Sequence, residues 1–346
     1  MKVMQVMAGA EHGGAEAFFE RLAPALHHGG IETLAVIRSN AKRARLLRDA
    51  GLDVVELRFG GRLDLASGWG LRRHIASFQP QVVMTWMNRA TAFCPSGKFV
   101  HVARLGGYYD LKYYRRCHHL IGNTQDIATW IAAQGWPAQQ VHYLPNFAAA
   151  ASTPAVARKD FYTPPDAPLI LALGRLHENK AFDVLLRAIA QVPDVYLWLA
   201  GEGPLRGELE HLATQLSIRP RVRFLGWRDD VAALYAAADI FVCPSRHEPL
   251  GNVVIEAWAQ GLPVVATAAQ GPNALIQDGV TGLLIPIDEP ALMAQALKRL
   301  LFEPDLAETL GAAGQRSYAE NFTEAAVIEH YRAFFEKVTA CAASPA

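Results

Sequence analysis

Two cations follow an apolar run at residues 169–173. Arg175 and Lys180 stand five positions apart in the segment GRLHENK (174–180), and a helical pattern begins directly after it. The first turn of a helix carries free N–H groups and a partial positive charge, which attract anions. A guanidinium adds a two-pronged donor and an ammonium adds a point charge. The pair therefore suits a diphosphate, and this strand–loop–helix placement argues against the alternative of two solvated surface cations.

A second polar segment, SRHEPLGNVVIEAW (245–258), also follows an apolar run. Pro249 and Gly251 keep Glu248 in a loop, because neither residue favours a helix interior. Asn252 is expected to cap the helix that follows, and Glu256 lies one turn further along the same face. Carboxylates accept paired hydrogen bonds from neighbouring sugar hydroxyls. The alternative for Glu256, a solvent-exposed helical position, is weak because its neighbours are mostly apolar.

Two glycine-rich segments also follow apolar runs, AGAEHGGAE (8–16) and GEGP (201–204). Gly13 and Gly14 allow a backbone to approach a ligand closely before a helix begins. The first segment matches neither the dinucleotide-binding nor the P-loop pattern. Taken alone, each is equally compatible with an ordinary turn after a strand.

The elements that position these loops alternate between apolar runs and amphipathic stretches. Strands are expected at residues 2–9, 33–38, 54–57, 81–86, 99–105 and 119–123, and then at 169–174, 195–201, 221–226, 239–245, 262–268 and 282–286. This alternation predicts parallel sheets covered by helices on both faces. We therefore expect an α/β protein with two tandem Rossmann-like, doubly wound domains facing a cleft. Ligands of such sheets bind beyond the carboxyl ends of the strands.

The pattern is interrupted at residues 145–168, which are rich in proline and small residues and read as a linker. We expect an acceptor-binding domain at 1–150 and a nucleotide-sugar donor-binding domain at 151–322. A strongly periodic helix at about 323–340 needs a partner surface for its apolar face, and we expect it to pack back on the first domain.

The overall charge is balanced but unevenly distributed. The 346 residues include 33 Lys and Arg and 33 Asp and Glu, a balance that argues against a nucleic-acid-binding protein. Residues 1–150 contain 17 Lys and Arg against 10 Asp and Glu, a net charge of +7. The remaining residues therefore contain 16 Lys and Arg against 23 Asp and Glu, a net charge of −7. No apolar run is long enough to span a membrane, and the first residues do not read as a signal peptide. We expect a cytoplasmic protein whose four scattered cysteines are free, buried thiols.

These motifs together resemble those of family-4 retaining glycosyltransferases, which have the GT-B fold. The resemblance covers nearly the whole chain. It rests on GGAE (13–16), LPN (144–146), the GRL and Lys180 of 174–180, GEGP (201–204) and the E-x7-E of 248–256. The last element and the GRL…K loop are the specific ones.

The resemblance implies a role for each matching residue. Arg175 and Lys180 would act catalytically by holding the donor diphosphate and stabilising the leaving nucleotide, and Glu248 would bind hydroxyls of the donor sugar. Donor-binding roles fall to Gly14, to the backbone amides of Leu250, Gly251 and Asn252, to Glu256 at the ribose, and to the loop of Trp227 near the nucleobase. The family retains anomeric configuration and generally uses no metal, so we expect no cofactor. We expect the donor substrate to be a UDP- or GDP-sugar. The chain has no D-x-D triplet, in keeping with metal independence.

One region departs from the family pattern. A histidine often follows the fourth or fifth strand near the acceptor, whereas this chain reads FVHVARLGGYYD (99–110) there. We interpret His101 as a core histidine, and we expect Arg104 and Tyr108 on the acceptor side. The catalytic base stays open, because a departing phosphate can itself take the acceptor proton.

The basic first domain is where the acceptor should bind. Its run YYDLKYYRR (108–116) mixes aromatic and cationic side chains, as membrane-surface segments do. We expect an anionic glycan or lipid-linked acceptor from lipopolysaccharide or other cell-envelope polysaccharide synthesis. Peripheral contact with the anionic inner face of the cytoplasmic membrane is expected too, against the alternative of a merely solvated face. The basic side chains concerned are Lys42, Arg43, Arg45, Arg48, Arg72, Arg73, Lys112, Arg115 and Arg116.

Three other functions compete with glycosyl transfer. A nucleotide-sugar epimerase on the same fold would need acid and base groups on both walls of the site, and we identify none. A nicotinamide oxidoreductase is disfavoured by the absence of G-x-G-x-x-G and by the Arg–Lys loop. A non-catalytic binding module fits least well with cations and carboxylates placed after successive strands.

Overall fold

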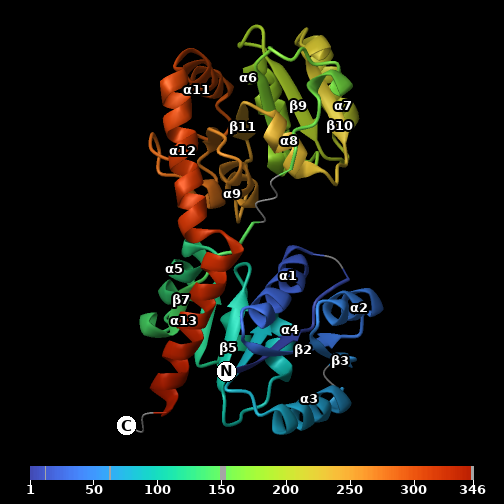
Figure 1. Ribbon diagram of the computed structural model, residues 1–346, viewed down its shortest axis with the longest axis vertical. Helices are drawn as coiled ribbons and strands as arrows, with labels where there is room; N and C mark the ends of the chain where they lie inside the picture. Colours follow the sequence, from blue (N-terminus) through green and yellow to red (C-terminus); the bar gives the residue numbers. More distant parts are fainter. Residues whose placement is uncertain (12, 62–63, 149–152, 344–346) are drawn as a thin grey trace. The chain divides into compact units, whose positions relative to one another are not determined.

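The computed structural model describes residues 1–11, 13–61, 64–148 and 153–343 (Figure 1). The chain divides into two compact units. Unit 1 comprises Met1–Asn146 and Glu324–Ala346, and unit 2 comprises Phe147–Thr323. The domain boundary expected at residues 150 and 151 falls in the segment 149–152, outside the described residues.

The sheet of unit 1 has seven parallel strands in the order β3-β2-β1-β4-β5-β6-β7. The order runs outward in both directions from β1 and β4, which is the doubly wound arrangement expected from the sequence. The strands are β1 (Lys2–Met7), β2 (Glu32–Arg38), β3 (Asp53–Leu57), β4 (Val82–Trp86), β5 (Val100–Leu105), β6 (His119–Gly122) and β7 (Val141–Tyr143). β1, β4 and β5 are almost entirely buried, as strands covered on both faces should be.

Helices connect the strands of unit 1. They are α1 (Gly14–His28), α2 (Ala41–Asp49), α3 (Leu65–Phe78), α4 (Met87–Phe93) and α5 (Gln125–Ala133), with short 3-10 helices at Leu111–Tyr114 and Ala138–Gln140. The sequence predicts neither α4 nor β7. α4 follows β4 without a linking loop, and β7 has three half-buried residues at the sheet edge, too few for a clear apolar pattern.

The sheet of unit 2 has six parallel strands in the order β10-β9-β8-β11-β12-β13, again doubly wound. The strands are β8 (Leu169–Leu173), β9 (Tyr196–Ala200), β10 (Val222–Gly226), β11 (Ile240–Cys243), β12 (Val264–Thr267) and β13 (Leu283–Ile285). The helices are α6 (Phe182–Ile189), α7 (Arg206–Gln215), α8 (Val231–Ala237), α9 (Asn252–Ala259), α10 (Gln270–Leu275), α11 (Pro290–Phe302) and α12 (Pro304–Asn321), with 3-10 helices at Arg158–Phe161, Glu178–Lys180 and Arg219–Arg221. All six strands predicted for this half of the chain are present. The α/β class with two doubly wound sheets is thus confirmed.

The last helix, α13 (Glu324–Ala343), belongs to unit 1 and packs against α1 and β5 (Figure 1). Its apolar stripe is buried throughout: Val327, Ile328, Tyr331, Phe334, Phe335 and Val338 are each at most 7% exposed. Unit 1 therefore completes its core with residues from both ends of the chain.

The four cysteines are free thiols, as expected from their spacing. Cys94, Cys117 and Cys243 are buried, and burial raises the pKa of the Cys94 thiol to about 12. The expectation of burial is wrong for Cys341, which lies on an exposed position of the last helix.

Candidate active site

The loop after β8 carries the first pair of candidate residues. Its 3-10 helix, Glu178–Lys180, ends at Ala181, where α6 begins, so Lys180 stands close to the amino end of that helix. The Lys180 stem lies over Gly174, with Cε 3.2 Å from where a Cβ at residue 174 would be. Arg175 is exposed and has no hydrogen-bond or ion-pair partner among the described residues. One cation of the pair is thus held and the other is free to meet a ligand.

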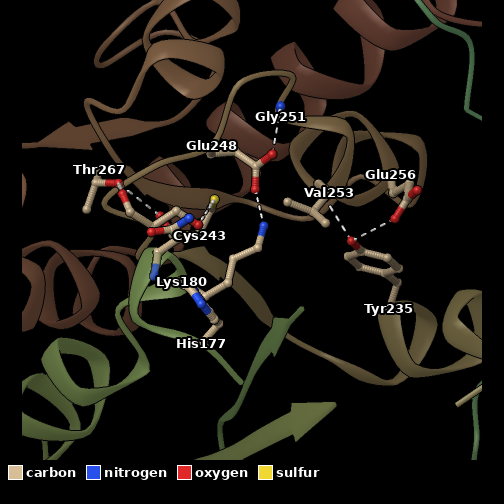
Figure 2. A network of polar contacts seen from close by, with 11 residues as sticks. His177, Lys180, Tyr235, Cys243, Glu248, Gly251, Val253, Glu256 and Thr267 are labelled. Atoms are coloured by element: carbon tan, nitrogen blue, oxygen red, sulfur yellow. Dashed lines mark hydrogen bonds and ion pairs between the residues drawn. The ribbon is translucent and has the colours of Figure 1, made fainter. Parts of the chain in front are cut away.

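The Lys180 ammonium forms an ion pair with the Glu248 carboxylate (Figure 2). Glu248 follows β11 and is 8% exposed, and its second oxygen accepts a 3.4 Å hydrogen bond from the Gly251 N–H. Partly buried charges of opposite sign offset each other's desolvation. The two residues expected to do chemistry from different loops of unit 2 are therefore in direct contact.

The backbone of the Glu248 loop is packed against the start of α10. The Glu248 carbonyl accepts a 2.7 Å hydrogen bond from the Gly271 N–H, and a Cβ at Gly271 would lie 2.6 Å from the Gly251 nitrogen. Gly251 adopts a φ of 68°, in the left-handed region that glycine tolerates. The loop therefore depends on glycine at both positions.

The expected capping role of Asn252 is wrong. Gly251 is the N-cap of α9 and Asn252 is the first helical residue, because the positive φ at Gly251 ends the loop one position earlier than predicted. As a glycine, Gly251 has no side chain that could accept from the first N–H groups of α9. These amides, beside Leu250 and the buried Gly251, are a suitable site for an anion or a hydroxyl oxygen.

Glu256 lies one turn into α9 and is partly exposed. The Tyr235 hydroxyl, from α8, lies 3.2 Å from Glu256 Oε2 and 2.9 Å from the Val253 carbonyl (Figure 2). Burial, followed by the Glu256 carboxylate, raises the pKa of Tyr235 well above its usual value, so the phenol stays a donor. Sequence reasoning missed Tyr235. A lone hydroxyl in the apolar pattern of 231–237 was the available signal, because a buried phenol needs a partner.

Arg246 is a second residue that sequence reasoning missed. It forms a two-pronged contact with Asp183, in the first turn of α6, with distances of 2.8 and 3.0 Å. It also bonds Asp288 at 2.6 Å and donates to the Glu178 carbonyl at 3.0 Å. Arg246 therefore ties the Lys180 loop to the Glu248 loop. Its place in the same loop as Glu248 was the signal that could have identified it.

The GEGP segment is more than a turn. Gly201 and Gly203 face the backbone of the Arg175 loop, and Cβ atoms there would lie 2.0 Å from the Gly174 carbonyl oxygen and 2.3 Å from the Leu176 carbonyl oxygen. The Leu176 N–H also donates to the Glu202 carbonyl at 3.0 Å. The segment thus supports the Arg175 loop from the neighbouring strand.

Trp227 follows β10 and is 72% exposed. Its indole N–H donates a 3.0 Å hydrogen bond to Asp229. A large exposed ring at the carboxyl end of a strand is free to stack on a planar ligand group. Its role toward a nucleobase stays a prediction.

In unit 1 the glycine-rich loop after β1 is built around Glu16. This carboxylate is 5% exposed and accepts a 2.7 Å hydrogen bond from the Ala10 N–H. Cβ atoms at Gly9 and Gly13 would lie 2.2 and 2.3 Å from its oxygens, so larger residues there would displace it. A Cβ at Gly14 would meet no atom within 4 Å. Gly14 therefore borders open space, whereas Glu16, whose role the sequence did not reveal, holds the loop.

Arg43 also holds this loop, and its expected place on the basic surface that meets the acceptor or the membrane is wrong. It is 2% exposed, bonds Glu20 at 2.7 Å, and donates to the carbonyls of Ala10 and Glu11 at 3.2 and 3.1 Å. Burial is tolerated because the guanidinium finds a carboxylate and two carbonyls.

Arg104 ends up inside unit 1. It is 2% exposed and lies over the rings of Phe18 and Trp86, 4.7 Å from each centroid. It donates to the Tyr331 hydroxyl at 2.8 Å and to Asn146 at 2.6 Å. These contacts give it a packing role, and a role toward an acceptor stays a prediction.

Tyr108 is 43% exposed and its hydroxyl contacts the Asp126 carboxylate. Burial, and then that carboxylate, raises the pKa of Tyr108 to about 12. His101 is a core residue, as interpreted from the sequence: it is 2% exposed and lies 3.0 Å from the Thr85 hydroxyl. Within the run 108–116, Tyr113, Lys112, Arg115 and Arg116 are exposed, whereas Tyr114 is wholly buried.

The described residues also bear on metal binding and on membrane insertion. No cluster of three or more His, Cys, Asp or Glu side chains in that part of the chain is arranged to hold a metal ion. None of its helices is both long and apolar enough to cross a bilayer.

Comparison with known proteins identifies the family. Residues 167–303 match the model of the glycosyl transferases group 1. The chain is 37% identical over 342 residues to the lipopolysaccharide core biosynthesis glycosyltransferase LpsD of Rhizobium meliloti, covering 97% of this chain and 98% of LpsD. It is also 37% identical over 335 residues to LpsE of the same organism, covering 96% of this chain and 98% of LpsE.

Solved structures agree on the fold. HepE of Anabaena in complex with UDP superimposes with a TM-score of 0.83 at 20% identity, over 97% of this chain and all of that one, and its complex with UDP-glucose gives 0.77. The two doubly wound sheets are those of the GT-B fold. The matched proteins are glycosyltransferases, which does not favour the epimerase alternative. The chain belongs to the group 1 glycosyltransferases and is a glycosyltransferase of the GT-B fold.

Proposed function

We propose that this enzyme transfers a sugar from a nucleotide-diphosphate sugar to an anionic glycan or lipid-linked acceptor in lipopolysaccharide core synthesis. The observation that carries the proposal is the Lys180–Glu248 contact between the loops after β8 and β11. Support also comes from the full-length similarity to LpsD and LpsE and from the binding of UDP and UDP-glucose by HepE.

The donor chemistry follows from the charges of these loops. The free Arg175 and the amino end of α6 attract the diphosphate, and Lys180 can leave Glu248 for a phosphate oxygen. Glu248 then accepts from the sugar hydroxyls in place of the ammonium. Glu256, oriented by Tyr235, accepts from the ribose hydroxyls, and Trp227 stacks on the base. The ion pair thus compensates both charges until the donor binds, when its phosphate replaces Glu248 as the partner of Lys180 and its sugar replaces Lys180 as the partner of Glu248.

Transfer breaks the anomeric C–O bond, so negative charge grows on the diphosphate while the sugar becomes cationic. Arg175 and Lys180 stabilise the former, because two cations held against the bound diphosphate oppose the negative charge that grows there. We propose further that the protein is a retaining enzyme of family 4 that needs no metal. It would also need no separate base, since the departing phosphate oxygen accepts the proton of the acceptor hydroxyl.

We propose that the acceptor binds unit 1, which carries the exposed cations Lys112, Arg115 and Arg116 beside exposed Tyr113. Such a mixture favours the anionic inner face of the cytoplasmic membrane. Anionic liposomes at low salt should retain the wild-type protein, and retention should fall for Arg115→Ala/Arg116→Ala. Equal retention of both proteins would count against membrane contact.

The function itself is tested with the purified full chain. A thermal-shift panel of UDP-, GDP- and ADP-sugars identifies the donor, because a ligand that binds the native state raises Tm. The labelled donor is then incubated with lipopolysaccharide extracted from a strain lacking this gene. Transfer into the lipopolysaccharide is expected, with the product anomer matching the donor by NMR. Hydrolysis or epimerisation without transfer would overturn the proposal, and an inverted anomer would overturn retention alone.

A further inference from the structure

A cavity of about 1000 Å³ lies at the opposite edge of unit 1 from its glycine-rich loop. It is bordered by the first residues of β5, β6 and β7 and by the last turns of α13. Because all strands of the sheet are parallel, these first residues mark its amino edge. We call this space the amino-edge cavity. None of the residues assigned above to donor or acceptor lines it.

The titratable side chains of the amino-edge cavity are basic and imidazole groups and the thiol of Cys341. Lys98 precedes β5 and Lys337 belongs to α13. His118 is the residue before β6, His119 begins β6, and His142 lies in β7. Among the described residues, no Asp or Glu lines the cavity. Neither ammonium has a hydrogen-bond or ion-pair partner in the described part of the chain. The cations are thus uncompensated by protein, although they share one concave site.

Each of the histidine contacts leaves a ring N–H available to a ligand. His118 accepts a 2.8 Å hydrogen bond from the His101 N–H through Nδ1, so the neutral ring carries its proton on Nε2. His119 Nδ1 and His142 Nε2 lie 3.1 Å apart, so one ring donates to the other. The ring that accepts this hydrogen bond carries its own proton on its second nitrogen, and that N–H can donate to a ligand. An acceptor-rich ligand would find such donors beside two ammonium groups.

The electrostatics show positive charge crowded around two of these rings. Burial, and then His119 and Lys337, lowers the pKa of His142 to about 4. Burial, His118 and Lys337 likewise lower the pKa of His119. A bound anion would oppose this crowding of positive charge and raise both pKa values.

We propose that the amino-edge cavity binds a phosphate ester, with Lys98, Lys337 and His118 holding the phosphate and the buried side chains of Phe99 and Val338 meeting its apolar part. A phosphate dianion matches the charge of two ammonium groups, which bind its oxygens as point donors. The cavity volume is in the range of sites that enclose a small organic ligand. The phosphate would link α13 to the sheet and so stabilise unit 1.

The test uses pyrophosphate as the soluble probe and the full chain carrying Arg175→Ala and Lys180→Ala. Those two changes remove the cations proposed for the donor, so remaining binding reports another site. Isothermal titration is repeated after adding Lys98→Ala and Lys337→Ala. The matched control adds Lys159→Ala and Arg316→Ala, which remove two exposed cations of unit 2. Thermal unfolding verifies that each variant is folded.

We expect pyrophosphate to bind the parent and the control alike, and its Kd to rise at least about tenfold in the Lys98/Lys337 variant. The ring ¹⁵N signals of His119 and His142 should shift on binding. No binding at millimolar pyrophosphate, or an equal Kd in all three proteins, would overturn the proposal.

Vesicles then distinguish the source of the phosphate. Sedimentation with phosphatidylcholine vesicles containing phosphatidic acid is compared for wild type and Lys98→Ala/Lys337→Ala. These outcomes apply if pyrophosphate binding depends on the two lysines. Loss of sedimentation in the variant would then identify the ligand as a lipid headgroup, and unchanged sedimentation would identify it as a soluble phosphate ester. Sugar transfer by this variant, in the otherwise native chain, should persist, so the donor site and this site are judged separately.

Discussion

The Lys180 ammonium and the Glu248 carboxylate meet although 68 positions separate them in the chain. Each comes from a loop at the carboxyl end of a strand, and β8 and β11 are neighbours in the sheet of unit 2. The contact therefore results from strand order, and it joins the group proposed for the phosphate to the group proposed for the sugar.

Removing either partner of this pair should remove sugar transfer. Lys180→Ala and Glu248→Ala are each expected to lower kcat/KM by about 10²-fold or more, because preorganised charge is lost. Each also leaves a partly buried charge unpaired, so the double variant should be less destabilised than the sum of the two. Radiolabelled transfer and urea unfolding measure both effects. Wild-type turnover in both single variants would exclude the assignment.

Gly201→Ala should destabilise unit 2 by at least about 2 kcal/mol, because its Cβ would overlap the Gly174 carbonyl oxygen. Gly207→Ala is the matched control. It lies in α7, its Cβ would meet nothing within 4 Å, and alanine should stabilise the helix by about 0.5–1 kcal/mol. Urea midpoints compare the two variants. Equal midpoints would show that the GEGP segment does not support the Arg175 loop.

Gly14→Ala should separate stability from activity. Its Cβ would enter open space, so Tm should stay unchanged, whereas a ligand that approaches this backbone would be obstructed and kcat/KM should fall about tenfold. Glu16→Ala, by contrast, removes the acceptor for the Ala10 N–H and should lower both Tm and activity. Full activity in Gly14→Ala would place the donor and acceptor away from this loop.

His101 should make the protein acid-sensitive. Burial, and then His118, lowers its pKa to about 4, below the value near 6.5 of an unfolded chain, so the unfolded state binds the extra proton. Stability is therefore complete above pH 6.5 and is lost as the pH falls from about 6.5 to 4, by an amount of the order of 3 kcal/mol. Urea midpoints at pH 7 and pH 5 should differ less in His101→Gln than in wild type. The exposed His330→Gln is the control, and an identical pH dependence in all three proteins would refute the assignment.

The sequence was sufficient for elements with continuous apolar runs, and for residues that directly follow them. β8 and β11 were recognisable in this way, and so were Lys180 and Glu248 at their ends. The roles of Tyr235 and Arg246 were not recognisable, because their partners lie 21 and 63 positions away. Arg43 was misread for the same reason: its distant carboxylate and carbonyl partners are what make its burial possible.

The division of the chain has a consequence for its synthesis. Unit 2 is continuous, whereas unit 1 needs Tyr331 and Phe335 of α13, which are wholly buried in it. A ribosome completes residues 147–323 before it makes these two side chains. Domains generally fold as units as they are made, so we expect unit 2 to reach its native state first. Unit 1 is begun first, but its apolar surface stays uncovered until the last helix is made. We therefore expect unit 1 to depend on chaperones more than unit 2 does.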